Sequence, residues 1–525
     1  MDTKALRQKI LDLAIRGKLV PQDPNDEPAS VLLERIRAEK QQMVKDGKLK
    51  PKDIKNDTVI FKGDDNLHYE QYADGTVKCI EDEIPFDIPD SWVWCRLNDL
   101  ALYKKGPFGS SITKAMFVPE SDNVIKVYEQ KNAINKSAQL GHYFISQEKY
   151  EELKGFEVFP GDIIVSCAGT IGETFVMPHD MRKGIINQAL MKIHLFDSSV
   201  KAFYLMYFDN KLKTLANEQG YGMALKNIPP FSILKRYLIP IPPKAEQERI
   251  LDHIKIILAN INDIDLLAGK LKNDVANAKS KILDLAIRGK LVPQDPNDEP
   301  ASVLLERIRA EKEELIKQGK IKRDKKESVI FKGDDNSYYQ DLPSNWIKIR
   351  LSTISEIITK GTTPRGGKVA YSQSGIGFLR AENIAGYDKL DLSNLNYVDE
   401  ESHNNYLKRS ILKENDILIT IAGTLGRTAI VPQQALPLNT NQAVAIVRLV
   451  NNRLINVKYL VYALNSPIIK SDLLAKSVDM AIPNLSLENI SDCNISLPPL
   501  AEQKRIVDEI EKIFAVLDDI ANQVA

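Results

Sequence analysis

Cysteine, histidine and long hydrophobic runs are scarce in this sequence, and each scarcity excludes a class of protein. The four cysteines show neither the paired spacing of a disulfide framework nor that of a zinc knuckle, and they are Cys79, Cys95, Cys167 and Cys493. The six histidines show no metal-ligand spacing. No apolar run approaches the ~18 residues of a membrane span, and the charged start over residues 1–9 does not resemble a signal peptide. We therefore expect a cytoplasmic protein with no membrane segment.

A net charge is also absent, because 71 Lys and Arg balance 71 Asp and Glu. Nucleic-acid binders are usually basic, so any such affinity must be local or shared with a partner. Two long segments do carry a net positive charge. Residues 88–243 hold 18 basic and 15 acidic residues, and residues 342–499 hold 16 and 13. This small positive excess in each segment suits binding to phosphate.

Enzyme signatures are absent as well. The string at 227–231, NIPPF, resembles the Asn-Pro-Pro-aromatic grip of an adenine methyltransferase, but an inserted isoleucine breaks its geometry. The stretch 361–368, GTTPRGGK, has the wrong spacing for a phosphate loop, and Val369 stands where a Ser or Thr magnesium ligand belongs. A nuclease pattern through Asp122, Glu129 and Lys131 is too loose to distinguish from chance. We expect a chain that carries no catalysis and needs no cofactor.

An internal repeat is the dominant positive feature. Residues 9–40 recur without a change at 281–312, VIFKGDDN at 59–66 recurs at 329–336, and IPPKAEQERI at 241–250 returns as LPPLAEQKRI at 497–506. The segments between these markers match only in outline. They share three pairs, which are 88–97 with 342–351, 161–172 with 415–426, and Asn-Gln-Ala at 187–189 with 441–443. The chain is thus a tandem duplication of roughly 1–272 and 273–525.

A heptad repeat of apolar residues, here called the seam, follows the string IPPKAEQERI at 241–250. Apolar residues recur in alternating steps of four and three, at Ile250, Ile254, Ile257, Ile261, Ile264, Ala268, Leu271, Val275, Ala278, Ile282 and Leu285. This is the a/d pattern of a coiled coil, roughly 50 Å long at ~1.5 Å per residue. The segment from Ile506 to Val524 repeats the apolar spacing of the first half of this seam. Leu6, Ile10 and Leu13 repeat the spacing of its second half. The pattern predicts that both chain ends run antiparallel to one central helix, in a pseudo-twofold arrangement. The alternative is that each amphipathic helix packs only on its own domain.

These elements resemble the conserved regions of type I restriction–modification specificity subunits. The likeness rests on P-P-x-A-E-Q-x-R-I, on D-I-L-I-T-x-A-G-T-L-G and on LAIRGKLVPQDPNDEPASVLLERI, and it covers essentially the whole chain. It implies that each variable domain reads one half of a bipartite double-stranded DNA target, while the helices set the gap and dock two adenine methyltransferase subunits. Two ATP-dependent motor–nuclease subunits would complete a restriction complex. S-adenosylmethionine, ATP and magnesium would belong to those partners.

The predicted fold class is α+β, with two similar target-recognition domains of mixed β-sheet and short helices joined by long antiparallel coiled-coil helices. We assign an N-terminal helical region to 1–66, recognition domains to 88–243 and 342–499, a central region with the long helix to 244–336, and a C-terminal helix to 500–525. Two alternatives remain open. One is a specificity subunit of a related system with a fused methyltransferase–nuclease, and the other is a coiled-coil scaffold that does not bind DNA.

Two loops in each recognition domain are candidates for DNA contact. The first is a basic, glycine-containing loop whose backbone can approach phosphate closely. Its candidate residues are Lys104, Lys105, Ser110, Ser111 and Lys114 in one copy and Lys360, Thr362, Thr363, Arg365 and Lys368 in the other. The second pair aligns Gln130, Lys131 and Asn132 with Arg380 and Asn383, whose side chains suit the edges of adenine and guanine. Solvated turns and ordinary loop divergence are the plainer explanations.

Two repeated features receive other interpretations. The Asn-Gln pairs at 187–188 and 441–442 are identical in both copies, so we expect them to hold a turn. The identity of the 32-residue repeat, including the loop GKLVPQDPNDEPAS, favours docking of two identical partners over recent duplication alone.

Overall fold

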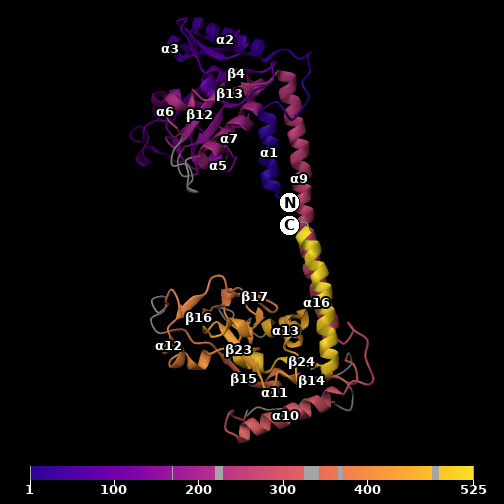
Figure 1. The fold of residues 1–525 in the computed structure, drawn as a ribbon. Coiled ribbons are helices and arrows are strands. Elements are labelled where there is room, and N and C mark those ends of the chain that lie inside the picture. The colour runs from indigo at the N-terminus through magenta and orange to yellow at the C-terminus, as the bar shows by residue number, and fades with distance from the viewer. Residues whose placement is uncertain are drawn as a thin grey trace. The chain divides into compact units, whose positions relative to one another are not determined.

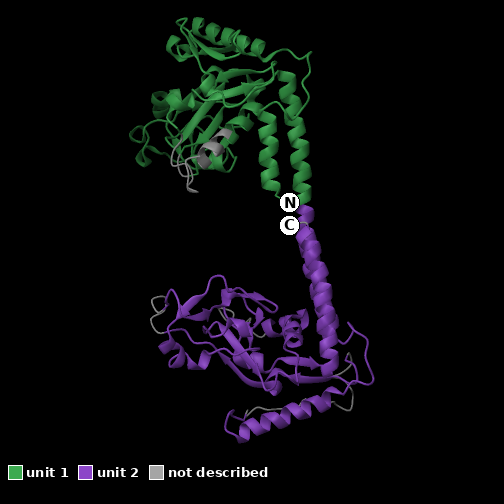
Figure 2. Cartoon of the chain, in the orientation of Figure 1, with its two compact units in different colours: residues 1–265 green, residues 266–525 purple. Residues whose placement is uncertain are grey.

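A computed structural model describes residues 2–167, 170–218, 229–323, 342–364, 371–475 and 484–523. The chain divides into two compact units, residues 1–265 and 266–525 (Figure 2). Within the described ranges, no helix has the length and apolar character needed to cross a membrane. The four cysteines are free thiols.

Unit 1 begins with helices and continues into the predicted recognition domain, which is built on small sheets (Figure 1). Its strands are β1 (Thr58–Lys62), β2 (His68–Tyr72), β3 (Val77–Cys79), β4 (Val93–Arg96), β5 (Ala101–Lys105), β6 (Ile125–Tyr128), β7 (Phe144–Ile145), β8 (Glu157–Val158), β9 (Ile163–Ser166), β10 (Thr174–Val176), β11 (Gly184–Ile186), β12 (Leu190–Leu195) and β13 (Leu238–Ile241). Its helices are α1 (Thr3–Ile15), α2 (Ala29–Lys45), α3 (Pro51–Ile54), α4 (Leu97–Leu100), α5 (Gln130–Ile134), α6 (Gln147–Leu153), α7 (Lys201–Glu218), α8 (Phe231–Leu234) and the first half of α9 (Lys244–Ile287).

Unit 2 has the corresponding elements. Its strands are β14 (Ile347–Arg350), β15 (Ser355–Lys360), β16 (Ile376–Leu379), β17 (Ile384–Gly386), β18 (Lys389–Leu390), β19 (Asn396–Val398), β20 (Ile417–Thr420), β21 (Thr428–Ile430), β22 (Leu438–Thr440), β23 (Val444–Leu449) and β24 (Asn494–Leu497). Its helices are the second half of α9, α10 (Ala301–Lys317), α11 (Leu351–Ile354), α12 (Glu400–Asn404), α13 (Val457–Asn465), α14 (Pro467–Ala475), α15 (Leu487–Ser491) and α16 (Leu500–Gln523).

Sheet topology confirms the predicted duplication and the α+β class. Unit 1 contains an antiparallel sheet in the order β10-β9-β12-β5, and unit 2 contains its counterpart, β21-β20-β23-β15. A second sheet mixes parallel and antiparallel pairs in each unit, β7-β6-β11-β8 in one and β19-β16-β22 in the other. A two-stranded ribbon closes each recognition domain by pairing its first strand with its last, β4 with β13 and β14 with β24.

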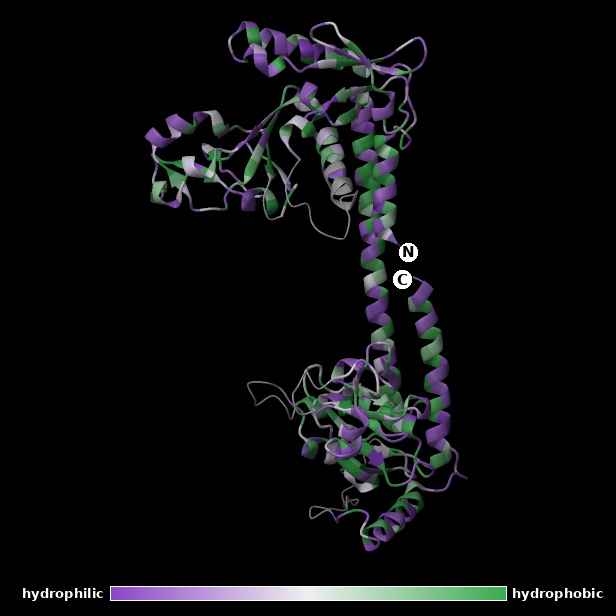
Figure 3. Ribbon diagram, turned by 60° about the vertical axis from the view of Figure 1, so that its left-hand side comes forward, coloured by the Kyte–Doolittle hydropathy of each residue, from purple (hydrophilic) through white to green (hydrophobic). Residues whose placement is uncertain are grey.

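The predicted central helix is observed as α9, an unbroken helix of 44 residues (Figures 1 and 3). In unit 1 it packs against α1, where Ile10 and Ala14 share a buried cluster with Ile250 and Ile254. Arg7 Nη2 donates to Asp265 Oδ2 at 2.9 Å near the start of α1, while the residues that follow α1 reach the start of α9. The two helices are therefore antiparallel, as the heptad seam predicted.

In unit 2, α16 packs antiparallel to the second half of α9. Lys279 Nζ donates to Asp518 Oδ1 at 2.5 Å, and Phe514 joins the cluster that contains Leu283 and Ile287. The seam differs from the prediction in two places. In the middle of α9 the predicted seam residue Ile264 is exposed, and at the end of the helix Leu283, Ala286 and Ile287 are buried while Leu285 is only half-buried. The helix presents a different face at this point because it now packs on the domain core as well as on α16.

A latch fastens the repeated loop to the long helix in each unit. In unit 1, Glu246 is fully buried and accepts from Trp92 Nε1 at 2.9 Å and from Gln22 Nε2 at 2.6 Å. Arg249 Nη2 donates to Asp26 Oδ2 at 2.5 Å. Unit 2 repeats these contacts through Gln294, Asp298, Trp346, Glu502 and Arg505. We call each five-residue set a latch.

The latch changes the interpretation of the identical repeat. We predicted that its exposed loop serves partner docking, but Gln22 and Asp26 of that loop are committed to α9, and their counterparts to α16. The repeat's last lysines are also structural. Lys40 Nζ donates to the carbonyl of Asn98 and Lys312 Nζ to that of the corresponding Ser352. Much of the sequence identity is therefore explained by identical contacts within each unit.

Candidate nucleic-acid interface

Two parallel strands of unit 1 end side by side at Asn187. Strand β11 pairs with β6 so that Ile186 lies opposite Tyr128, and parallel strands end at the same sheet edge. Asn187 N then donates to the Tyr128 carbonyl at 3.0 Å, and its own Oδ1 accepts from Ala189 N at 3.0 Å. The prediction that the Asn-Gln pair holds a turn is confirmed. This turn places the segment after β6, which contains Gln130 and Lys131, directly beside it.

The basic loop that follows strand β5 contacts the same turn. Gly106 N donates to the Leu190 carbonyl at 2.9 Å, and a Cβ at Gly106 would lie only 1.8 Å from the Asn187 carbonyl oxygen. Only glycine permits such a close approach of two backbones. The two predicted contact segments, 104–111 and 130–132, therefore both lie next to the Asn187 turn, although more than 50 residues of sequence separate Asn187 from either segment.

Unit 2 builds the same junction around Asn441. A Cβ at Gly361 would lie 2.1 Å from the Asn441 carbonyl oxygen, and Thr362 N donates to the Thr440 carbonyl at 2.9 Å. Asn441 N donates to the Leu379 carbonyl at 3.2 Å, immediately before Arg380. Asn441 Oδ1 accepts from Ala443 N at 3.2 Å, so this second Asn-Gln pair also holds a turn.

The basic loop of unit 1 presents its charges to solvent. Lys104, Lys105, Ser110 and Lys114 are exposed, and Ser111 is half-buried. Lys104 lies directly across the β5–β12 pair from Lys192, a residue that sequence reasoning missed. Burial lowers the pKa of Lys192, while the Asp162 carboxylate acts to raise it and the charge of Lys104 acts to lower it. Two like charges opposite each other across a sheet are unfavourable, and Lys192 Nζ offsets this by donating to the Glu157 carbonyl.

The corresponding loop of unit 2 is less basic where the structure describes it. Lys360 is exposed, Thr362 and Thr363 are half-buried, and Arg409 Nη2 donates to Thr362 Oγ1 at 3.4 Å. Arg409 therefore brings a further cation to this loop from a distant part of the domain. Arg365 and Lys368, which we also predicted to bind DNA, lie outside the described residues.

Asn132 and Asn383 do not have the role that we predicted for them. Both are buried, and each accepts from the backbone N–H three residues earlier, at 2.8 Å and 2.9 Å respectively. Each side-chain amide also donates to two carbonyls of the loop that follows, those of Ser137 and Leu140 in unit 1 and of Asp391 and Asn394 in unit 2. Their side chains shape the loop and leave no edge for a base.

These shared contacts define how the two segments align. Because Asn132 corresponds to Asn383, Glu129 corresponds to Arg380 and Gln130 to Ala381. Glu129 forms an ion pair with Lys131 at 2.8 Å, whereas Arg380 forms one with Glu382. The two domains thus carry oppositely ordered charges at matching places.

Some polar atoms at these edges lack protein partners. Among the described residues, Gln130 Oε1 and Arg380 Nε are buried and accept or donate no hydrogen bond. Buried polar atoms are normally paired, so a ligand that supplies the missing donor or acceptor would stabilise them. Gln130 and Arg380 belong to the two edges that we expect to meet bases.

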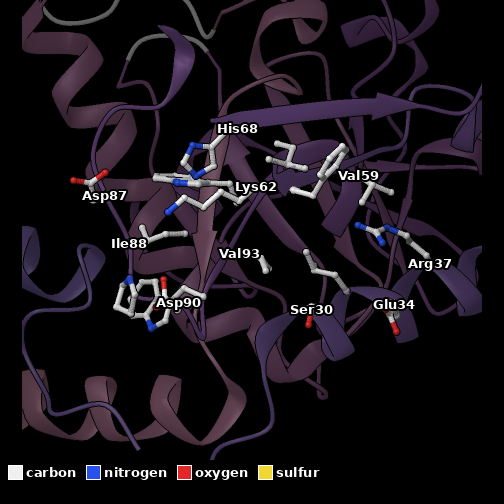
Figure 4. Close-up of a pocket in the computed structure, with 16 residues that line it drawn as sticks. Ser30, Glu34, Arg37, Val59, Lys62, His68, Asp87, Ile88, Asp90 and Val93 are labelled. Atoms are coloured by element: carbon white, nitrogen blue, oxygen red, sulfur yellow. The ribbon is translucent and has the colours of Figure 1, made fainter. Parts of the chain in front are cut away.

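A pocket of about 470 Å³ lies elsewhere in unit 1, between α2, the β1–β2 hairpin and the segment 87–94 (Figure 4). Its lining combines apolar side chains such as Ile88 with charges of both signs, among them Arg37, Lys62 and Asp90. His68, which also lines it, is held by Glu81 at 2.8 Å. The pocket shares no residue with either predicted contact loop. The described residues contain no group of three side chains arranged to hold a metal ion.

The family comparison agrees with this duplicated arrangement. Residues 89–273 and 343–524 each match the model of a family described as type I restriction modification DNA specificity domain. The chain is 28% identical to the type I restriction enzyme EcoEI specificity subunit of Escherichia coli, over 99% of this chain and 90% of that protein. It is also 28% identical to the EcoAI specificity subunit of Escherichia coli, over 97% and 89%. The crystal structure of the HsdS subunit from Thermoanaerobacter tengcongensis matches with a TM-score of 0.43 and 16% identity, covering 84% of this chain and 95% of that one.

Proposed function

The chain belongs to the type I restriction–modification DNA specificity family, and from this premise we propose that residues 88–243 and 342–499 read the two halves of a bipartite DNA target. It is the subunit that supplies DNA sequence specificity to a type I restriction–modification system.

One observation carries the proposal for the site. In each unit the basic loop and the segment of differing charge meet at an Asn-Gln turn, at Asn187 and at Asn441. The basic loop supplies cations for phosphates and fixes the position of the domain on the duplex. The adjoining edges differ in charge order, with Lys131 paired to Glu129 in one unit and Arg380 paired to Glu382 in the other. Different side chains on one common frame are what two readers of different half-sites require.

The chain would act without catalysing a reaction itself. In this proposal S-adenosylmethionine, ATP and magnesium bind to partner subunits, two adenine methyltransferases and two motor–nucleases, at the DNA in the cytoplasm. The spacer between the half-sites would be set by α9 and its antiparallel neighbours, with half-site centres about one helical turn, ~34 Å, apart.

The docking face for the methyltransferases would be the exposed remainder of the identical repeat. On α2 these residues include Glu34 and Arg35, and α10 repeats them at Glu306 and Arg307. Two identical faces suit two identical partners. Arg35→Glu or Arg307→Glu should each remove one methyltransferase from the complex, measured as the mass of the assembled particle, and the double variant should remove both. Full assembly of the double variant would refute this docking face.

Mapping of modified adenines tests the reading assignment. The full chain with its methyltransferase partner is expected to methylate one bipartite sequence in cells. Arg380→Ala should relax sequence choice in one half-site only, by ~1–3 kcal/mol of discrimination at one base pair, and Lys131→Ala should act only on the other half. Glu248→Ala, an exposed change on α9, serves as the control. Changes in the spacer, or in both halves at once, would contradict the assignment.

A further inference from the structure

A single aromatic ring projects from the tip of the basic loop in unit 1. Phe108 is 87% exposed, more than any other large hydrophobic side chain among the described residues. It stands between Pro107, which is buried, and the short turn Gly109–Ser111. A ring this exposed is free to contact a ligand, and covering it would remove apolar surface from water.

The tip that carries this ring is held at both ends. On one side Gly106 N donates to the Leu190 carbonyl at 2.9 Å, and on the other Ile112 is 4% exposed within a buried cluster. Within the turn, Ser111 N donates to the Phe108 carbonyl at 2.8 Å. Since the backbone is already ordered, insertion of the ring into a ligand would lose little conformational entropy.

The surroundings of Phe108 fit a polyanion better than a protein partner. Lys104, Lys105 and Lys114 are exposed on the strand and turn that flank it. Its neighbours along the tip are the buried Pro107 on one side and glycine and serine on the other, so no exposed apolar side chain adjoins the ring in the sequence. Protein interfaces bury contiguous apolar surface at their centre, whereas proteins that deform DNA use single apolar wedges with cations on either side.

We propose that Phe108 inserts between adjacent bases of the half-site read by residues 88–243 and partly unstacks them. The flanking lysines bind the phosphates on either side of that step. This inference rests on the proposed function and adds to it a deformation of the DNA, which contributes specificity through the ease with which a given base step opens.

Comparison of the two units shows that only the domain of unit 1 carries an aromatic ring at this position. Gly106 corresponds to Gly361, since both glycines contact the Asn-Gln turn, so Phe108 corresponds to Thr363. A threonine side chain is too small and too polar to insert between stacked bases. The DNA is therefore unstacked in one half-site and not in the other.

The test uses the full chain assembled with its methyltransferase partner and a duplex that carries the target found by methylation mapping. 2-Aminopurine replaces one base at a time through both half-sites, because its fluorescence rises when it is unstacked. The wild type should raise the fluorescence at one step of one half-site only. Phe108→Ala should abolish the rise and weaken specific binding about tenfold or more, as expected when an aromatic ring loses its cover.

Controls separate the wedge from folding and from general DNA binding. Phe108→Trp should retain the fluorescence rise. Phe61→Ala, an exposed phenylalanine on β1 that is 41% exposed, should leave fluorescence and affinity unchanged. Because Phe108 is exposed, Phe108→Ala should unfold at the wild-type temperature and keep its binding to non-specific DNA within about twofold.

The test distinguishes failure of the wedge from failure of the proposed function. Specific, salt-dependent binding by the wild type with no fluorescence rise at any step would overturn the wedge and leave the proposed function intact. A loss of affinity in Phe108→Ala without such a rise would mean that the ring packs against the sugar–phosphate surface, which also overturns insertion. Absence of specific DNA binding by the wild-type complex would overturn both proposals.

Discussion

Removal of the latch carboxylate gives a stringent test of how the repeat stabilises each unit. Glu246→Ala takes the acceptor from two hydrogen bonds, those of Trp92 Nε1 at 2.9 Å and Gln22 Nε2 at 2.6 Å. A hydrogen bond to a charged group contributes about 1.5–3 kcal/mol, and the buried indole N–H would be left without a partner. Burial raises the pKa of Glu246 although these two bonds lower it, so part of the loss is recovered when the buried charge is removed. We expect a net loss of about 2–4 kcal/mol from the free energy of unfolding of unit 1.

The duplication supplies an internal replicate. Glu502 is also fully buried and accepts from Trp346 Nε1 at 2.9 Å and Gln294 Nε2 at 2.5 Å. Glu502→Ala should therefore destabilise unit 2 by the same amount, to within about 1 kcal/mol. Glu246→Gln keeps one acceptor and should cost roughly half as much as Glu246→Ala. Glu248→Ala, on an exposed position of the same helical turn, should stay within about 0.5 kcal/mol of the wild type.

Native-state hydrogen exchange of the full chain, read by peptide mass across a urea series, measures the two units separately. Each alanine variant should lower the opening free energy of its own unit and leave the other unchanged. Because folding raises the pKa of Glu246, this residue also makes stability depend on pH. Its contribution to the free energy of unfolding is present below the pKa of the unfolded state and is lost as pH rises through the pKa of the folded state. The gap between the wild type and Glu246→Gln should therefore be wider at pH 4 than at pH 7. Losses under about 1 kcal/mol in either alanine variant, or unequal losses in the two, would refute the latch.

Three further predictions concern pH, salt and spacing. Burial acts to raise the pKa of Glu70, but the Arg96 guanidinium outweighs it and lowers that pKa to about 2, so unit 1 should lose about 3 kcal/mol as pH falls from about 5 towards 2. Urea unfolding of Glu70→Gln should show a weaker loss over the same range, and equal curves would contradict the ion pair. Lys104→Gln and Lys105→Gln should each weaken DNA binding uniformly across sequences and reduce the slope of log affinity against log salt by about 1, and an unchanged slope would show that the residue contacts no phosphate. One heptad inserted after Leu271, with α16 extended to match, should lengthen the spacer found by methylation mapping, and altered half-sites with an unaltered spacer would reverse the assigned roles.

Local patterns in the sequence determined the duplicated plan. Identical strings such as 9–40 and 281–312 fold alike because they meet alike surroundings, and α2 and α10 indeed have matching bounds and matching buried lysines. The heptad steps predicted one long helix because an a/d stripe requires a helical partner along its length, and α1 and α16 supply one within each unit. The glycines at 106 and 361 and the Asn-Gln pairs were recognisable from their recurrence alone.

The tertiary structure decided which of these features meet and which side chains remain free. The Asn187 turn unites two loops because β11 pairs in parallel with β6 across more than 50 residues, and no local pattern specifies that register. Asn132 looked suited to a base, but loop carbonyls at Ser137 and Leu140 occupy its amide, and the identical loop at 17–30 turned out to bind α9. A side chain's chemistry can be read from its type, whereas its availability depends on the long-range partners that folding brings to it.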